Sequence, residues 1–224
     1  MVADATVGST ILLTVPILER IRPIEGWLTD AEADVLIAAA RHVCSSFPPD
    51  HAIVEVGSYQ GRSTVALASV AACLAPRMRV HAIDPHEGEV GAAGSIEQTA
   101  ATLDALRVNL AAAGIAEHVL IRLQRSYEVD WEGPIGLLFV DGLHDEENCA
   151  RDFHCFAPYL ADGALVAFHD YGGWPGVTSF VDSLGERYAR LAQAGSMILL
   201  RAPAQAGPLR ARRGFRRLGA ARRA

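Results

Sequence analysis

Residues 135–144 read IGLLFVDGLH and residues 164–171 read ALVAFHDY, and these two stretches decide the fold. Each is an apolar run typical of a buried strand, and each ends in an acid, Asp141 or Asp170. Neighbouring strands of a parallel sheet lie about 4.8 Å apart, so both carboxylates would stand at the same edge. Open α/β sheets bind their ligands at that edge, and we expect the functional site there.

Two histidines stand beside these acids. His144 follows the first strand and His169 directly precedes Asp170. A pair of carboxylates with nearby imidazoles is typical of a divalent metal site. Two solvated loop acids after buried strands fit the same residues, so both interpretations stay open at this point.

Outside these stretches, apolar strands and amphipathic helices alternate along the chain. The expected strands are Ala52–Val56, Arg79–Ile83, His118–Leu123, the two quoted runs, a short strand near Leu191, and Met197–Arg201. The expected helices run from Thr29 or Asp30 to His42, and over Arg62–Leu74, Ser95–Ala113, Glu147–Tyr159 and Val177–Tyr188. This alternation, with a Gly195–Ser196 turn near the end, predicts an α/β fold: a Rossmann-like, mostly parallel seven-stranded sheet with a C-terminal antiparallel hairpin and helices on both faces.

The chain divides into one expected domain with a segment on either side. Residues 29–203 form the domain, and 224 residues are enough for one full α/β core. Residues 1–28 are expected to pack over the sheet edge, with Val15–Ile24 completing the pocket. The four cysteines form no CxxC pair, which argues against a zinc site. The longest apolar run, Val65–Ala75, is too short to span a bilayer, and the start shows no signal peptide, so we expect a cytoplasmic protein.

Charge is distributed unevenly between the body and the end of the chain. All twenty basic residues are Arg, and the formal charge is −16 over residues 1–186 and +10 over residues 187–224. Residues 204–224 form an Arg-rich tail that could bind nucleic acid or an acidic surface. It has one aromatic residue, Phe215, so a nucleic-acid platform is not favoured. We expect a disordered tail and no nucleic-acid partner.

The first strand runs into the turn VEVGSYQGRS, residues 54–63. Its two glycines allow a tight turn and close approach of a ligand, but the GxGxxG dinucleotide motif is absent. Glu55 can accept from an ammonium group, and Ser63 at the next helix start can bind a carboxylate. Asp84 ends the second strand, where an acid can hold ribose hydroxyls. The alternative to ligand binding is that the two glycines only form the turn and that Asp84 only caps neighbouring backbone amides. The cofactor-binding candidates here are Glu55, Gly57, Ser58, Tyr59, Gly61, Ser63 and Asp84, with Gln124, Arg125 and Ser126 near an adenine edge and Asp141 after the fourth strand.

With the turn VEVGSYQGRS, the strand end HAIDPHEG and the block from Leu137 to Tyr171, the chain resembles class I S-adenosylmethionine-dependent methyltransferases. More narrowly, it is similar to the metal-dependent O-methyltransferases that include macrolide-sugar, sugar-polymer and catechol enzymes. The resemblance covers residues 24–202. It implies that Glu55, Gly57, Gly61 and Ser63 hold the methionine part of the cofactor and Asp84 the ribose. It also implies that Asp141 and Asp170 bind magnesium.

Two positions depart from that pattern. His144 stands where the catechol enzymes have Lys, and His169 stands where Asp or Glu is common. Magnesium prefers oxygen ligands, whereas imidazole suits manganese, iron, nickel or zinc. We expect Asp141, His169 and Asp170 to hold Mg²⁺ or Mn²⁺. The alternative is that His169 does not bind the cation itself and only contacts the residues that do.

A bound cation would orient an acceptor hydroxyl and lower its pKa, and a nearby base would remove its proton. His144 is the expected base; a loop histidine capping the next helix is the alternative. A sugar hydroxyl is a weak acid that needs both aids, so we expect a small-molecule or oligosaccharide acceptor. The narrower expectation is a methylated mannose polysaccharide; a macrolide sugar, a phenol or, in another class, a nicotinamide-dependent oxidoreductase are alternatives. The Pro85–Ser95 loop is expected to close over the site as a lid. An apolar wall of the site is expected from Tyr171, Trp174 and Pro175. We expect the protein to assemble as a homodimer.

Overall fold

The computed structural model describes residues 12–87 and 102–204. Its helices are α1 (Thr14–Ile21), α2 (Asp30–Ser46), α3 (Arg62–Leu74), α4 (Thr102–Ala112), α5 (Glu146–Phe156) and α6 (Pro175–Ser183). Its strands are β1 (Ala52–Val56), β2 (Val80–Ile83), β3 (Val119–Arg122), β4 (Ile135–Val140), β5 (Leu160–Phe168), β6 (Ala189–Ala194) and β7 (Met197–Arg201). The expected start of the α4 helix, the expected lid beyond Glu87 and the Arg-rich tail lie outside the described residues.

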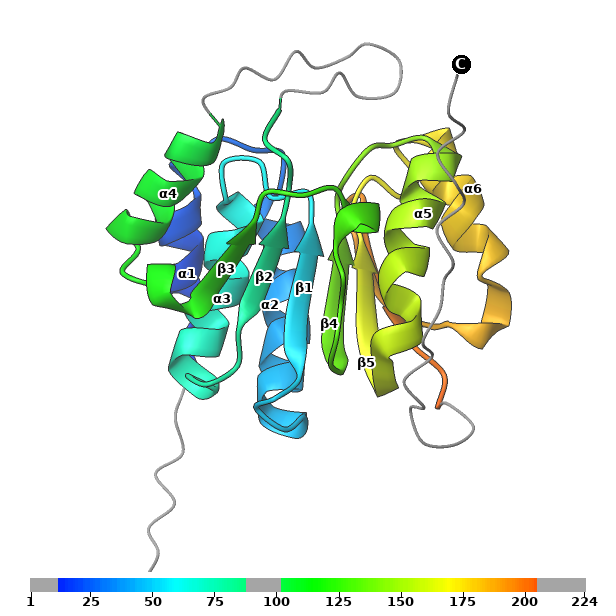
Figure 1. The fold of residues 1–224 in the computed structure, drawn as a ribbon, viewed down its shortest axis with the longest axis horizontal. Helices are drawn as coiled ribbons and strands as arrows, with labels where there is room; N and C mark the ends of the chain where they lie inside the picture. The colour runs from blue at the N-terminus through cyan, green and yellow to red at the C-terminus, as the bar shows by residue number, and fades with distance from the viewer. Residues whose placement is uncertain (1–11, 88–101, 205–224) are drawn as a thin grey trace, which may run out of the picture.

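The strands form one sheet in the order β3-β2-β1-β4-β5-β7-β6. Figure 1 shows the first five in this order from left to right. The first five strands pair in parallel, and β7 is antiparallel to both β5 and β6. The predicted Rossmann-like sheet with a terminal hairpin is therefore confirmed. The chain order reverses between β1 and β4, and a ligand crevice forms outside the strands at such a point.

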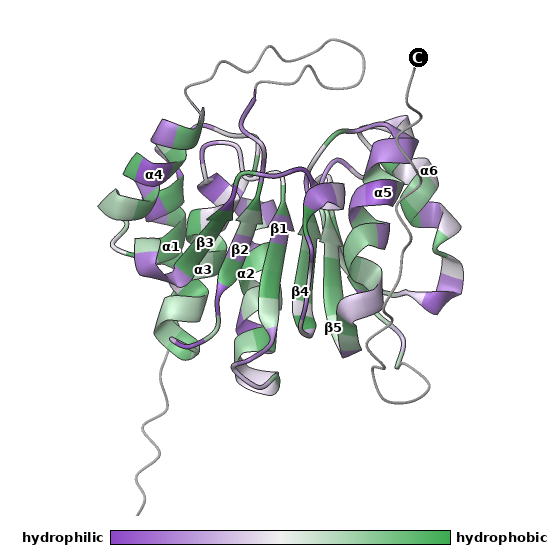
Figure 2. Ribbon diagram, in the orientation of Figure 1, coloured by the Kyte–Doolittle hydropathy of each residue, from purple (hydrophilic) through white to green (hydrophobic). Residues whose placement is uncertain are grey.

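The central strands β1, β4 and β5 are apolar on both sides, which is why each face of the sheet carries helices (Figure 2). In β4, Leu137 and Phe139 point to one core and Leu138 and Val140 to the other. The first core is closed by α1, α2, α3 and α4, and the second by α5 and α6. Among the described residues, none of the helices has the length and apolar character needed to cross a bilayer.

Helix α1 was not predicted from the sequence. It has only eight residues and contains Pro16, which weakens the helical signal. Proline is tolerated there because the amides of the first turn have no partner inside a helix. Ile17, Leu18 and Ile21 are buried in the first core, so α1 is a structural helix. Of the N-terminal segment expected beside the pocket, Glu25–Leu28 line the cavity described below, whereas Val15–Ile24 do not.

Candidate active site

A cavity of about 330 Å³ opens at the carboxyl edge of the sheet, over the point where the strand order reverses. Its walls come from the turns after the five parallel strands and from the loop between α1 and α2. Of the residues predicted from the sequence, those that line it are Gly57, Ser58, Tyr59, Ser63, Asp84, Gln124, Arg125, Ser126, Asp141, His144, His169, Asp170 and Trp174. Glu55 and Gly61 lie behind this lining.

Gly57 lets the turn after β1 pack directly on the end of β4. Its φ of +87° is in the left-handed region that favours glycine, and a Cβ here would lie 2.0 Å from the carbonyl oxygen of Asp141. The Gly57 amide also donates to the carbonyl of Ile83 at 2.9 Å. One glycine therefore joins the ends of three adjacent strands.

Glu55 supports this turn from below. Its side chain is fully buried, and its two carboxylate oxygens accept from the hydroxyls of Ser63 (2.5 Å) and Thr64 (2.6 Å) in the first turn of α3. Burial raises the pKa of Glu55 to about 8 in spite of these hydrogen bonds. Because the Ser63 hydroxyl donates to Glu55, the donors that remain for a ligand on this side of the cavity are the first backbone amides of α3.

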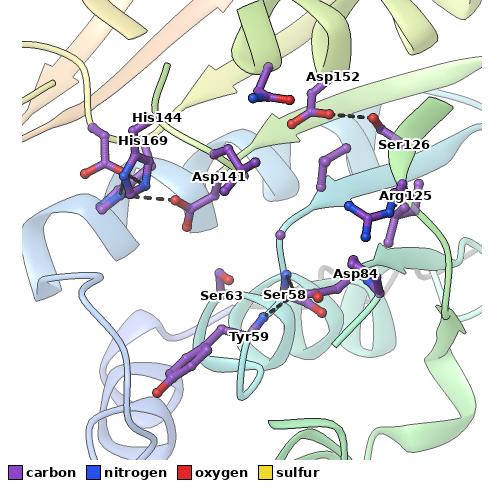
Figure 3. Close-up of a pocket in the computed structure, with 18 of the residues that line it drawn as sticks. Ser58, Tyr59, Ser63, Asp84, Arg125, Ser126, Asp141, His144, Asp152 and His169 are labelled. Atoms are coloured by element: carbon purple, nitrogen blue, oxygen red, sulfur yellow. Dashed lines mark hydrogen bonds and ion pairs between the residues drawn. The ribbon is translucent and has the colours of Figure 1, made fainter. Parts of the chain in front are cut away.

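Asp84 ties the end of β2 to the same turn. Its carboxylate accepts from the backbone amides of Ser58 and Tyr59, each at 2.9 Å, and from that of His86 at 2.8 Å (Figure 3). A carboxylate has about four acceptor positions, so Asp84 retains capacity for one further donor. The structural and ligand-binding interpretations of Asp84 are therefore compatible.

The far end of the cavity contains a buried acid that the sequence analysis did not identify. Asp152 of α5 accepts from the Ser126 hydroxyl at 2.5 Å (Figure 3). Burial raises the pKa of Asp152 to about 6 against this hydrogen bond. Nearby, Arg125 pairs with Glu87 at 2.9 Å. Asp152 was missed because a single acid within the sequence ARDFH is typical of a solvent-exposed position on a helix. Its burial results from the packing of α5 against Ser126, which no local pattern indicates.

At the opposite end, Asp141, His144 and Asp170 converge, as the pairing of β4 with β5 requires. One ligand atom from each lies within 4.8 Å of the other two. His144 Nε2 lies 3.0 Å from Asp170 Oδ2. Burial would lower the pKa of His144, but Asp170 outweighs it and raises the pKa. The expectation that the two acids stand side by side is confirmed.

His169 lies deeper than His144 and joins this cluster to α2. Its Nδ1 is 3.3 Å from Asp141 Oδ1 and 3.1 Å from Asp170 Oδ2. Its Nε2 lies 3.4 Å from the Ser196 hydroxyl and 3.6 Å from Glu32 Oε2. Burial opposes the charged form, but the two aspartates prevail and raise the pKa of His169 to about 11.

Glu32 was also missed by the sequence analysis. It stands in the first turn of α2 within an ordinary capping box, where its carboxylate accepts from the Thr29 amide and hydroxyl. The same carboxylate accepts from the amide and hydroxyl of Ser196, 164 residues away. The capping signal is local and visible in sequence, whereas the contacts with Ser196 and His169 depend on the fold.

The walls beside the cluster are aromatic. The His144 ring lies 4.6 Å from that of Trp174 at an angle of 35°. Gly176 at the start of α6 packs so tightly on the His144 loop that a Cβ would lie 2.6 Å from the His144 carbonyl oxygen. The predicted apolar wall at Trp174 is thus present in the cavity, and it holds the His144 ring in place.

The cluster fits a divalent cation. The carboxylates of Asp141 and Asp170 converge from adjacent strand ends with two imidazoles beside them, His144 partly exposed to the cavity and His169 buried, so either histidine could complete the set of ligands. A site with both oxygen and nitrogen ligands is less selective for Mg²⁺ than a site with oxygen ligands alone, and it can also bind Mn²⁺.

A family model described as a methyltransferase domain matches residues 54–171, more than half of the chain. The matched span begins at β1 and ends just after Asp170, so it contains the turn, Asp84 and both acids of the cluster. The chain belongs to this methyltransferase family. As a class I S-adenosylmethionine-dependent methyltransferase, it is not the nicotinamide-dependent oxidoreductase considered above.

Solved structures share the fold of this methyltransferase. The O-methyltransferase NovP superposes with a TM-score of 0.65 at 15% identity, over 80% of this chain and 83% of NovP. TomG from Streptomyces achromogenes, an O-methyltransferase of tomaymycin synthesis in complex with SAM, gives 0.59 at 17% identity over 85% and 89% of the two chains. CalS11, a TDP-rhamnose 3'-O-methyltransferase of calicheamicin biosynthesis, gives 0.56 at 18% over 84% and 92%. At these identities the likeness establishes the fold alone.

Proposed function

We propose that this methyltransferase transfers the methyl group of S-adenosylmethionine to a hydroxyl of a carbohydrate or glycosylated small molecule, with the help of a divalent cation. The observation that carries the proposal is the convergence of Asp141, His144 and Asp170 at one end of the cavity. An alcohol is a weak acid, and two carboxylates with a histidine are a means of activating it.

The cofactor occupies the part of the cavity between this cluster and Asp152. The free amides at the start of α3 receive the methionine carboxylate, and Asp84 accepts from a ribose hydroxyl. Ser58, Tyr59, Gln124 and Ser126 line the same path. Glu55 and Gly61 contribute by holding the turn in place.

The two histidines have different tasks. His169 is buried with its Nε2 fixed near Ser196, so its Nδ1 faces the two aspartates and would hold the cation together with them. His144 is nearer the cavity surface; its Nε2 donates to Asp170 and its Nδ1 has no partner, so Nδ1 of the neutral ring holds the lone pair that can take a proton from the acceptor. Asp170 then stabilises the charged ring. A cation in this site would supply orientation and acidification of the acceptor hydroxyl.

The test is methyl transfer from labelled S-adenosylmethionine to a panel of mannosides, other glycosides, macrolide sugars and catechols. EDTA should abolish turnover, and Mg²⁺ or Mn²⁺ should restore it; full activity in EDTA would refute the role of the cation. A preference for catechols would replace the sugar acceptor by a phenol.

His144→Ala separates the base from the ligand. As a base, His144 contributes about 10²- to 10⁴-fold to turnover, and its loss should leave the affinity for Mn²⁺ and for S-adenosylhomocysteine unchanged. A parallel loss of Mn²⁺ affinity would make His144 the third ligand. His154→Ala, an exposed histidine of α5 outside the cavity, is the matched control.

A further inference from the structure

The loop between α1 and α2, residues Glu25–Leu28, forms one rim of the cavity. Trp27 in this loop is 58% exposed, although tryptophan is usually largely buried. Its ring lies 5.2 Å from that of Tyr59, at an angle of 44°. Aromatic rings at the mouth of a cavity are common in the lining of ligand-binding pockets.

The rim is held in one conformation by contacts with the cofactor turn. Arg62 donates to the carbonyl of Gly26 at 2.8 Å, and Leu28 is buried in the core. The Glu25 carboxylate accepts from the Tyr59 hydroxyl at 3.1 Å and from the Gln60 amide at 2.9 Å. A rim fixed in this way loses little entropy when it binds a ligand.

The rim also lies at the cluster end of the cavity. The chain passes from Leu28 directly into α2, where Glu32 contacts His169. Tyr59, which carries the contacts of Trp27 and Glu25, points away from Arg125 and Asp152 (Figure 3). Trp27 and Glu25 line the cavity beside Tyr59, on this side of it.

We propose that Trp27 and Glu25 form the subsite for an uncharged pyranose ring, which deepens the proposed function and rests on it. The C–H face of the ring stacks on the indole of Trp27, and ring hydroxyls donate to the Glu25 carboxylate. Each Glu25 oxygen accepts one hydrogen bond from the protein and keeps a free lone pair for this purpose.

The charges around this subsite select against a sugar nucleotide. Each arginine in the described lining of the cavity has a partner in the protein: Arg62 donates to Gly26, Arg125 pairs with Glu87, and Arg151 lies 3.5 Å from the exposed Glu147. Glu25 at the rim would repel a diphosphate. A nucleoside-diphosphate sugar such as a TDP-sugar would require cationic groups for its diphosphate, and this subsite has a carboxylate instead.

The experiment compares Trp27→Ala, Trp27→Phe and Glu25→Gln with wild type on methyl pyranosides. We expect Trp27→Ala and Glu25→Gln to raise KM by about tenfold or more with kcat little changed, and Trp27→Phe to recover most of the loss. Titration of the pyranoside into protein saturated with S-adenosylhomocysteine should show the same loss of affinity, while the Kd of S-adenosylhomocysteine itself stays constant. Leu191→Ala, an exposed apolar residue on edge strand β6, is the control.

Each outcome has one meaning. If wild type methylates pyranosides and Trp27→Ala has an unchanged KM, the subsite is refuted and the proposed function stands. If wild type prefers nucleoside-diphosphate sugars to pyranosides, the uncharged acceptor is refuted. If wild type with Mg²⁺ or Mn²⁺ methylates no sugar at all, the proposed function fails, and the subsite with it.

Discussion

At the scale of single residues, Glu55 shows how the site links folding to pH. Burial raises its pKa to about 8, compared with 4.5 for an ordinary glutamate. Between these values the folded protein holds a proton that the unfolded chain has released. Its contribution to stability is therefore fully present below the lower value and is lost as the pH rises through the upper one, by about 1.4 kcal/mol per pH unit in between.

We expect Glu55→Gln to remove this slope, because glutamine does not ionise. Urea denaturation of the cofactor-free proteins at pH 5, 6.5 and 8 should show the variant gaining stability relative to wild type as the pH rises. Asp104→Asn, an exposed acid of α4, is the control. A difference that stays constant over this range would show that Glu55 ionises normally.

Gly57 gives a second prediction at this scale. Gly57→Ala should lower the free energy of unfolding by about 2–4 kcal/mol and weaken S-adenosylhomocysteine binding, because the new Cβ collides with the Asp141 carbonyl. Gly114→Ala is a matched control: its φ is +67°, and nothing lies within 4 Å of the new Cβ. It should cost about 1 kcal/mol and leave binding intact. Equal effects of the two variants would refute the close approach.

Which site residues could be read from the sequence depends on how their positions are fixed. Asp141 and Asp170 each end a buried strand, so strand pairing alone brings them together. Asp152, Glu32 and Glu25 stand in a helix or a loop of ordinary composition. Their place at or beside the cavity follows from contacts with residues 26, 164 and 34 positions away, and no local pattern encodes these.

At the scale of elements, the N-terminus of α2 does two things at once. Its capping box satisfies the amides of Thr29 and Glu32, and Glu32 of the same box accepts from Ser196 on the β6–β7 turn. Although burial opposes ionisation, these hydrogen bonds lower the pKa of Glu32 to about 2. The resulting stabilisation is present above the ordinary value of 4.5 and is lost as the pH falls through the folded value.

Thr29→Ala and Glu32→Gln separate these two tasks. Thr29→Ala removes the cap hydroxyl and should cost about 1 kcal/mol of stability. Glu32→Gln turns an amide NH₂ toward donors from Thr29 or Ser196 and should cost about 2–3 kcal/mol at pH 7. Urea denaturation measures both, and the Glu32→Gln deficit should shrink at pH 3. A Glu32→Gln effect no larger than that of Thr29→Ala would show that the contact with Ser196 adds nothing.

The same scale explains where element prediction succeeded. Buried parallel strands are continuous apolar runs, and β1, β4 and β5 were found at close to their observed positions. Helix α1 was overlooked because its propensity is weak and its stability comes from packing on α2 and α3. Helices α5 and α6 end three and five residues earlier than expected, where each passes into a single 3₁₀ turn.

At the scale of the whole molecule, the sheet order places the turn after β1 and the acids after β4 and β5 around one cavity. Strand β1, which leads into the turn of residues 57–61, is adjacent to β4, which is followed by Asp141, and β4 is adjacent to β5, which leads to Asp170. The alternation of strands and helices predicts this order, but it leaves the lining loops undefined. This is why the acids of the cluster could be assigned one by one, whereas the N-terminal segment was expected beside the pocket without Glu25 or Trp27 being singled out.

Charge gives the prediction that belongs to this scale. Deleting residues 206–224 removes seven Arg and changes the formal net charge from −6 to −13. The described lining of the cavity runs from Glu25 to Trp174, so we expect kcat and KM for a small glycoside to stay within about twofold of wild type. Binding of the full chain to a polyanion such as heparin should fall steeply with salt and disappear on deletion, because neutralised phosphate or sulfate groups release their counterions. Loss of turnover on the small glycoside at matched ionic strength would instead make the Arg-rich tail part of the catalytic unit.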